Sequence, residues 1–133
     1  MIGLLVVTHC NIGKELLKAA ELVMGPLDLV DCISIESLFE AEKLILSLKD
    51  KIKALDKGKG VLIMTDMFGG TPCNISIPFM EENKVEVVTG VNLPMLLAVI
   101  RKRNQIGLLE LSKEAVDEAK DKIYLVKDLL PKR

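Results

Sequence analysis

Short apolar runs alternate with amphipathic stretches along this 133-residue chain, and that alternation leaves few possible architectures. Four runs have the length and the Val, Ile and Leu content of strands buried on both faces: residues 2–8, 29–34, 61–65 and 85–89. Between them, apolar residues recur at steps of three and four, which predicts helices. Successive βα units joined with right-handed connections give an open, mainly parallel, doubly wound α/β sheet with helices on both faces.

The C-terminal part of the chain carries weaker signals. Residues 112–122 have the pattern of a helix, and the short apolar stretch 123–126 is compatible with an edge strand. We therefore expect four parallel strands plus a C-terminal edge strand. No linker, repeat or low-complexity stretch interrupts the chain, so residues 1–133 are expected to form a single domain.

Composition excludes several classes of function. Eighteen Lys and Arg against nineteen Asp and Glu leave a net charge of −1, which provides no global field for nucleic acid or for an acidic membrane surface. The three cysteines, Cys10, Cys32 and Cys73, are an odd number without CxxC spacing, which indicates free thiols in a reducing, cytoplasmic compartment. Too few His and Cys ligands occur at suitable spacing for a metal site, and we expect no cofactor.

Three loops follow the first, third and fourth predicted strands: residues 8–11, 66–72 and 90–94. Ligands of doubly wound sheets bind beyond the carboxyl ends of the strands, where the strand order reverses. The side chains of these loops are therefore the candidates for chemistry.

His9 is the only histidine of the chain, and it lies in the first of these loops. A neutral imidazole can act as a nucleophile when its other ring N–H is held by an acceptor. Asp66, at the tip of the third predicted strand, is the candidate for that orienting carboxylate, as in the His–Asp half of a catalytic triad. The alternative is that His9 is a polar residue of a turn and that Asp66 caps a turn or helix.

Gly69, Gly70 and Thr71 precede Pro72, and the backbone of this segment is a candidate for binding a ligand. Two glycines let the backbone approach a ligand and direct its N–H groups inward. Thr71 is expected as the N-cap and Pro72 as the first helical residue, so that free N–H groups face a phosphoryl group. The alternative is an ordinary tight turn before a helix.

Three segments together resemble the enzyme IIA component of the mannose/fructose family of the phosphoenolpyruvate-dependent sugar phosphotransferase system. They are the apolar strand ending in Thr8-His9, the stretch 61–74 with Asp66-Met67-Phe68-Gly69-Gly70-Thr71-Pro72, and residues 89–96. The resemblance covers about residues 1–103 and implies a sugar-transport phosphotransferase with a covalent phosphohistidine.

The resemblance also implies roles and partners. The phosphoryl acceptor would be His9 at Nε2, the orienting carboxylate Asp66, and the hydroxyl near the phosphate Thr71. Phosphate would come from the phosphocarrier protein HPr and pass to a separate enzyme IIB, so that a membrane is involved only through the transporter subunits. The family is homodimeric through a crossing C-terminal strand, which the stretch 123–126 could supply.

Further expectations concern the partner surface and two departures from the family pattern. Met67, Phe68 and Asn92 are the candidates for docking partners. Cys10 stands where glycine often follows the histidine, so the turn there is expected to differ in shape. Pro78 should kink or divide the helix that follows Pro72.

Three other functions compete with this one. The phosphotransfer subunit of dihydroxyacetone kinase shares the fold and an N-terminal histidine, but it lacks the long segment around Gly69 and Gly70. A receiver domain would need an acidic pair for Mg²⁺ after the first strand, where this chain has Thr8-His9-Cys10-Asn11. A regulatory phosphoprotein would use the same His9 chemistry to control another protein.

Overall fold

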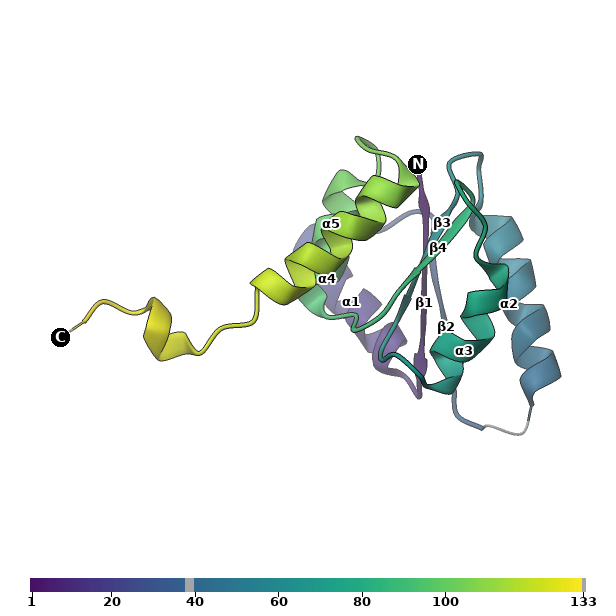
Figure 1. The fold of residues 1–133 in the computed structure, drawn as a ribbon, viewed down its shortest axis with the longest axis horizontal. Coiled ribbons are helices and arrows are strands. Elements are labelled where there is room, and N and C mark those ends of the chain that lie inside the picture. The colour runs from purple at the N-terminus through teal and green to yellow at the C-terminus, as the bar shows by residue number, and fades with distance from the viewer. Residues whose placement is uncertain (38–39, 133) are drawn as a thin grey trace.

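A parallel sheet forms the middle of three layers in the computed structural model, which describes residues 1–37 and 40–132 (Figure 1). The strands (β), helices (α) and 3-10 helices (η) follow in this order: β1 (Gly3–His9), α1 (Ile12–Met24), β2 (Val30–Ile35), α2 (Ala41–Leu55), β3 (Val61–Thr65), α3 (Thr71–Ser76), η1 (Ile77–Phe79), β4 (Val85–Val88), α4 (Leu93–Lys102), α5 (Leu108–Asp121) and η2 (Val126–Leu129).

The strands lie in the order β2-β1-β3-β4, and every pairing between them is parallel. The predicted open parallel sheet with helices on both faces is thereby confirmed. From β1 the chain first moves outward to β2 and then crosses to β3 on the other side. The order therefore reverses between β1 and β3, and their carboxyl ends flank the point where doubly wound sheets bind ligands.

Side chains alternate between the two faces of the sheet, as expected for strands that are buried on both sides. Leu4 and Val6 of β1 belong to a core cluster with α1, α4 and α5, whereas Leu5 and Val7 pack in a second cluster with α2. In Figure 1, α1, α4 and α5 lie on one side of the sheet, and α2 and α3 lie on the other. The same alternation directs Thr8 toward α1 and His9 toward α3.

Pro78 divides the helix that follows β3, as the sequence predicted. Helix α3 ends at Ser76, and the next three residues form the 3-10 helix η1. Proline has no N–H to donate to the carbonyl four residues earlier, so the α-helical ladder stops there. The helix beside the candidate site is consequently only six residues long.

The predicted C-terminal edge strand is not present in the sheet of the described residues. Residues 123–126 are not part of the four-stranded sheet that the described residues form, and the chain after α5 runs away from the body as an extended segment (Figure 1). Ile123, Leu125 and Val126 are 74%, 61% and 64% exposed. A strand needs a neighbouring backbone for its hydrogen bonds, and this segment leads away from β4.

Helix α5 also begins four residues earlier than the predicted helix, at Leu108. Leu108 and Leu111 are buried in the cluster with α4, and this packing extends the helix beyond the stretch with the clearest periodicity. Within the described part of the chain, no helix combines the length and the apolar character needed to cross a bilayer.

Candidate functional site

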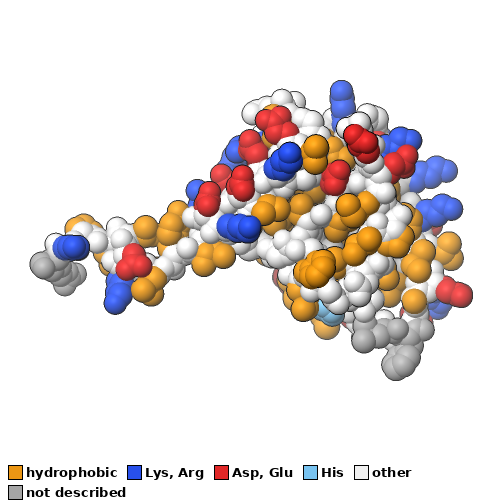
Figure 2. Space-filling model, in the orientation of Figure 1, with side chains coloured by type: hydrophobic (Ala, Val, Ile, Leu, Met, Phe, Trp, Pro, Cys, Tyr) orange, Lys and Arg blue, Asp and Glu red, His pale blue; other side chains and the backbone are white. Residues whose placement is uncertain are grey.

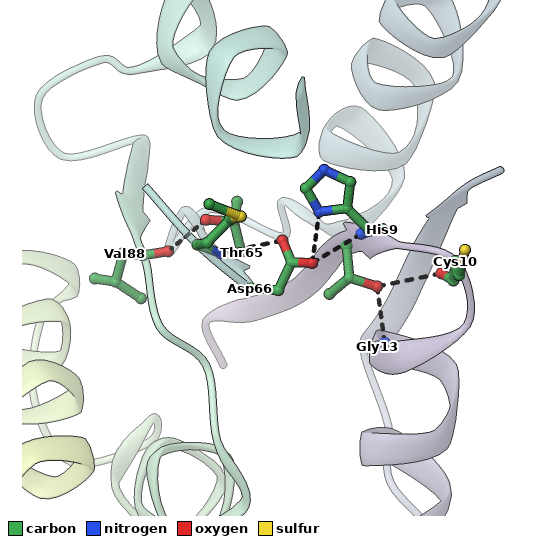
Figure 3. Close-up of polar contacts among 8 residues, drawn as sticks. His9, Cys10, Gly13, Thr65, Asp66 and Val88 are labelled. Carbon is green, nitrogen blue, oxygen red and sulfur yellow. Dashed lines mark hydrogen bonds and ion pairs between the residues drawn. The ribbon is translucent and has the colours of Figure 1, made fainter. Parts of the chain in front are cut away.

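Two adjacent strands place His9 beside Asp66. His9 is the last residue of β1, and Asp66 directly follows β3, with which β1 pairs in the register Val7↔Thr65. The backbone N–H of His9 donates to Asp66 Oδ2 at 3.0 Å, and its ring Nδ1 lies 2.8 Å from the same oxygen (Figure 3). The structure therefore brings together the histidine and the carboxylate that the sequence singled out.

The surroundings of Asp66 favour its ionised form. Burial by itself would raise the pKa of this carboxyl, but the hydrogen bonds from the His9 side chain and backbone outweigh it, and the pKa is lowered below its ordinary value. The other oxygen, Oδ1, accepts the N–H of Met67 at 3.1 Å. Both oxygens of Asp66 are thus occupied by donors, and the side chain is only 13% exposed.

An ionised Asp66 decides which ring nitrogen of a neutral His9 carries the hydrogen. The carboxylate can only accept, so Nδ1 must donate, and Nε2 keeps its lone pair. The His9 side chain is 37% exposed, so a reactant from solvent can reach it. This is the arrangement that a nucleophilic imidazole requires.

Gly70 packs against the edge of the imidazole that bears Nε2. A Cβ placed on Gly70 would lie 2.7 Å from His9 Cε1 and 3.2 Å from Nε2, which is too close for any other residue unless the ring moves. Gly69, the residue before it, has a φ of +84°, a conformation that glycine adopts without strain. The two glycines thus let the loop after β3 approach the ring.

Thr71 does not occupy the predicted N-cap position. Gly70 is the N-cap of α3, and Thr71 and Pro72 are its first and second residues. The extended backbone of Gly70, with φ −87° and ψ 171°, has the geometry of an N-cap residue, so the helix begins one residue later than predicted. Thr71 is half-buried at the start of the helix.

The turn between β1 and α1 contains a feature that the sequence analysis missed. Cys10 has a φ of +47°, in the left-handed region that glycine adopts most readily, and the expected difference in turn shape from the family stays a prediction. The buried Thr8 hydroxyl donates to the carbonyl of Cys10 at 3.3 Å and accepts the N–H of Gly13 at 2.9 Å (Figure 3). The only signal in the sequence was a threonine directly before the histidine.

Met67 and Phe68 follow Asp66 on the rim of the site. Their side chains are 53% and 77% exposed. Figure 2 shows hydrophobic side chains gathered beside the histidine at this edge of the molecule. An exposed apolar rim around a reactive side chain is typical of a surface that binds another protein.

Asn92, the third residue expected at a docking surface, lies farther into the fold. Its Oδ1 accepts the N–H of Met95 at 2.9 Å and caps α4, and its Nδ2 donates to the carbonyl of Ala119 at 3.1 Å. Asn92 is half-buried, and its amide joins the start of α4 to α5.

Among the described residues, no three His, Cys, Asp or Glu side chains come together in a group that could hold a metal ion. Cys10 is exposed and Cys73 is buried, and both thiols are free. The contact between His9 and Asp66 provides a nucleophilic imidazole with an orienting carboxylate.

The chain is similar to a known protein family and to proteins of known sequence. Residues 3–123 match the family described as PTS system fructose IIA component, where PTS denotes the phosphotransferase system. The chain is 34% identical over 104 residues to the mannose-specific EIIAB component of the phosphotransferase system of Escherichia coli. That alignment covers 77% of this chain and 32% of the relative, so the chain spans about a third of the length of the mannose-specific proteins it matches.

A second relative is similar over most of its own length. The sorbose-specific EIIA component of Lacticaseibacillus casei is 34% identical over 112 residues, which covers 81% of this chain and 78% of the relative. The crystal structure of the phosphotransferase system component EIIA from Streptococcus agalactiae has a TM-score of 0.86 at 24% identity, with 96% of this chain and 99% of that chain covered, and it shares the fold. The chain therefore belongs to the mannose/fructose family of enzyme IIA components of the sugar phosphotransferase system, a family of phosphotransferases.

Proposed function

We propose that this protein carries a phosphoryl group on Nε2 of His9. The observation that supports this most directly is the 2.8 Å contact between Nδ1 and Asp66 Oδ2, which leaves Nε2 with its lone pair. In the transfer, a bond forms between Nε2 and phosphorus while the bond between phosphorus and the nitrogen of the donor phosphohistidine breaks. The electron pair of the broken bond returns to the donor ring, and Asp66 stabilises the positive charge that develops on the His9 ring.

The loop after β3 is proposed to receive the phosphoryl oxygens. Gly70 already packs beside Nε2, so a phosphoryl group there would meet the backbone around Gly69, Gly70 and Thr71. The three loops at this edge of the sheet, residues 8–11, 66–72 and 90–94, contain no Lys or Arg. Neutral donors would hold the group without a strong ion pair, which suits a carrier that must release it again.

HPr is the proposed donor and a separate enzyme IIB the proposed acceptor. Catalysis of phosphoryl transfer depends mainly on positioning and electrostatics, so each partner must present its reactive group in line with Nε2. The exposed side chains of Met67 and Phe68 lie next to Asp66 in the chain, where either partner would meet the site. We propose that both partners dock there in turn, with Asn92 keeping the neighbouring loop in place.

A homodimer is the proposed assembly. Among the described strands, β4 pairs only with β3, so beyond the bridge between Val85 and Glu81 its other side is an open edge. The apolar segment 123–126 is exposed and pairs with no strand of the described chain. A shallow cavity beside the end of β4 is lined by Gly90, Val116 and Ala119 of the body and by Ile123 of the segment. A second copy that pairs its segment with β4 would cover both surfaces.

Residues 1–133 are proposed to act in the cytoplasm as one enzyme IIA domain. The sugar would be chosen by the transporter subunits, to which enzyme IIB passes the phosphoryl group. The same His9 chemistry would serve a regulatory phosphoprotein, and the presence of a cognate enzyme IIB distinguishes the two roles.

Intact-mass spectrometry tests the proposal. The wild type and His9→Ala are incubated with phosphoenolpyruvate, enzyme I and HPr whose activities have been verified. We expect the wild type alone to gain the mass of one phosphoryl group, and we expect acid to remove it, because phosphoramidate bonds are acid-labile. No gain in the wild type, or an equal gain in His9→Ala, would contradict the assignment.

A further inference from the structure

We infer that Thr8 is a positioning residue for phosphoryl transfer, and that its hydroxyl holds the turn that presents the His9 ring to Asp66. The inference rests on the proposed role of His9 as phosphoryl acceptor. Thr8 touches neither the reacting nitrogen nor Asp66 through any hydrogen bond found in the structure. Its influence is exerted through the backbone of the residues around His9.

The Thr8 hydroxyl links both ends of the turn. It accepts the N–H of Gly13 at 2.9 Å and donates to the carbonyl of Cys10 at 3.3 Å (Figure 3). Thr8 is fully buried, so water does not compete for these groups. One hydroxyl therefore closes the loop that runs from the end of β1 to the first turn of α1.

This contact replaces the usual cap of α1. The N-cap residue, Asn11, makes no side-chain hydrogen bond to the helix. The N–H of Gly13 is one of the first helical donors, which have no partner inside a helix, and Thr8 supplies its acceptor from β1. The start of the helix is thus attached to the strand that carries His9.

The left-handed conformation of Cys10 makes this attachment necessary. A residue with a Cβ adopts a φ of +47° only when its surroundings enforce it. The N–H of Cys10 donates to the carbonyl of Ile35 at 2.9 Å, and its carbonyl accepts the Thr8 hydroxyl. Both peptide groups of Cys10 are therefore fixed, one by β2 and the other by Thr8.

The geometry of His9 depends on that fixed turn. Its backbone N–H and its ring Nδ1 both meet the single oxygen Asp66 Oδ2, at 3.0 and 2.8 Å. A rotation of the backbone between Thr8 and His9 would change the direction of both donors together. Gly13 packs closely against β1, since a Cβ on Gly13 would lie 2.9 Å from Val6 and 3.3 Å from Thr8. The start of α1 therefore has little room to move relative to the strand.

The test compares Thr8→Val, which keeps the shape and removes the hydroxyl, with Thr8→Ser, which keeps the hydroxyl. Thr65→Val is the matched control, because Thr65 is equally buried and directly precedes Asp66, but its hydroxyl bonds to the carbonyl of Val88 on the neighbouring strand. For each full-length variant, the rate of phosphorylation by phosphorylated HPr is measured. The fractions of the two neutral His9 tautomers are measured separately by ¹⁵N NMR in the absence of phosphate.

We expect Thr8→Val to be phosphorylated about tenfold more slowly, since small misplacements of a nucleophile are costly. Its Nδ1–H tautomer should also lose population to the Nε2–H tautomer. Thr8→Ser and Thr65→Val should stay within about twofold of the wild type in rate, with an unchanged tautomer ratio. A purely structural role of Thr8 would alter the melting temperature and leave the tautomers as they are.

A wild-type tautomer ratio in folded Thr8→Val would overturn the inference, and so would equal slowing in Thr8→Val and Thr65→Val. If Thr8→Val does not fold, Thr8→Ala is measured in the same way, and failure of both to fold would assign Thr8 to stability alone. The tautomer measurement needs no phosphoryl donor. An unphosphorylated wild type would therefore refute the proposed function, while the tautomer ratio of Thr8→Val would still decide whether Thr8 orients the His9 ring.

Discussion

At the scale of single residues, one carboxylate oxygen of Asp66 holds the His9 imidazole in place. Asp66 Oδ2 accepts both the backbone N–H and the ring Nδ1 of His9. The hydrogen bond from the backbone N–H fixes the position of the His9 backbone. The contact with Nδ1 fixes the rotation of the ring and its tautomer. A charged acceptor is suited to this purpose, because charge-assisted hydrogen bonds are the stronger ones.

Replacement of Asp66 by Asn should slow phosphorylation of His9 by about a hundredfold, the usual cost of removing one preorganised electrostatic partner. An amide can still accept from Nδ1, but it cannot stabilise the positive charge on the ring. The fold should persist, because the substitution is isosteric. The matched control is Asp31→Asn, which removes a carboxylate paired with Lys51 outside the site. Wild-type kinetics in Asp66→Asn, measured by rapid quench, would remove Asp66 from the mechanism.

The lowered pKa of Asp66 also makes a prediction about stability and pH. A carboxyl whose pKa is lower in the folded state stabilises the fold above its ordinary pKa of 3.8, and this contribution is lost as the pH falls through the folded value. The difference in unfolding free energy between the wild type and Asp66→Asn should therefore shrink as the pH falls below about 5. Urea titrations at pH 7 and at pH 3 measure this difference. An unchanged difference would mean that His9 does not lower the pKa of Asp66.

Gly70→Ala should impair phosphorylation by about tenfold or more with little loss of stability. The new Cβ would lie 2.7 Å from His9 Cε1, so the ring must leave its position. Gly107→Ala is the matched control, since Gly107 is also an N-cap with φ −77° and ψ 170°, and a Cβ there meets nothing within 4 Å. The two variants are compared by phosphorylation rate and thermal melting. Equal rates would show that the contact of Gly70 with the ring is dispensable.

Phe68→Ala should weaken phosphoryl exchange with HPr and with enzyme IIB and leave the melting temperature unchanged. Phe68 is 77% exposed, so it contributes little to the core, but an exposed aromatic side chain can supply much of the energy of a protein interface. Leu22→Ala is the control, because Leu22 is 89% exposed on α1 and lies outside the site loops. The expected effect is a several-fold rise in KM for each partner. Unchanged KM values would exclude Phe68 from the docking surface.

At the scale of elements, the strands and helices near the site were well anticipated from the sequence. The four predicted parallel strands are present with ends within about one residue, because runs of Val, Ile and Leu buried on both faces leave little freedom. The end of α3 before Pro78 was also predicted, since the lost N–H is a property of proline itself.

Helix starts were less predictable, because capping depends on contacts from other elements. The cap of α3 is Gly70 and not Thr71, and the first turn of α1 takes its acceptor from Thr8 on β1. Local patterns favour Ser, Thr, Asp and Asn as caps, but a contact from a neighbouring strand can replace them. Asn92 is the case in which the residue type and the structure agree.

The cap of α4 allows a prediction at this scale. Asn92→Ala should lower the free energy of unfolding by about 1–2 kcal/mol, because the cap to Met95 and the bond to Ala119 are both lost. Asn92→Ser keeps an N-cap acceptor for the N–H of Met95 and removes the donor to Ala119, so its loss should be smaller. Urea unfolding measures the loss of unfolding free energy for both variants, with the same dependence on urea concentration as in the wild type. Equal losses would show that the cap contributes nothing.

At the scale of the whole molecule, the C-terminal segment contrasts with the packed body. The body buries apolar side chains on both faces of the sheet, whereas residues 123–126 expose theirs (Figure 2). Large exposed apolar surfaces of this kind usually mark an interface. The open edge of β4 and the cavity beside it are the surfaces that such a segment from a second copy would cover.

Removal of residues 123–133 should convert a dimer into a monomer. Sedimentation velocity measures the change, and far-UV circular dichroism should show that the sheet and helices remain, because none of these residues belongs to the sheet or to the core clusters of the described chain. His9→Ala serves as the control and should stay dimeric. A monomeric wild type at micromolar concentration would contradict the proposed assembly.

The sequence by itself determined the parallel α/β architecture and the sheet edge at which His9 and Asp66 meet. Both follow from local properties, namely the apolar character of each strand and the polar residues at its end. The tertiary structure alone decided that one carboxylate oxygen holds both the backbone and the ring of His9, and that Gly70 faces Nε2. It also decided that Thr8 closes the turn and that the C-terminal segment joins neither the sheet nor the core clusters of the described chain. Each of these depends on groups far apart in the sequence, whose distance is fixed only when the strands pair and the helices pack.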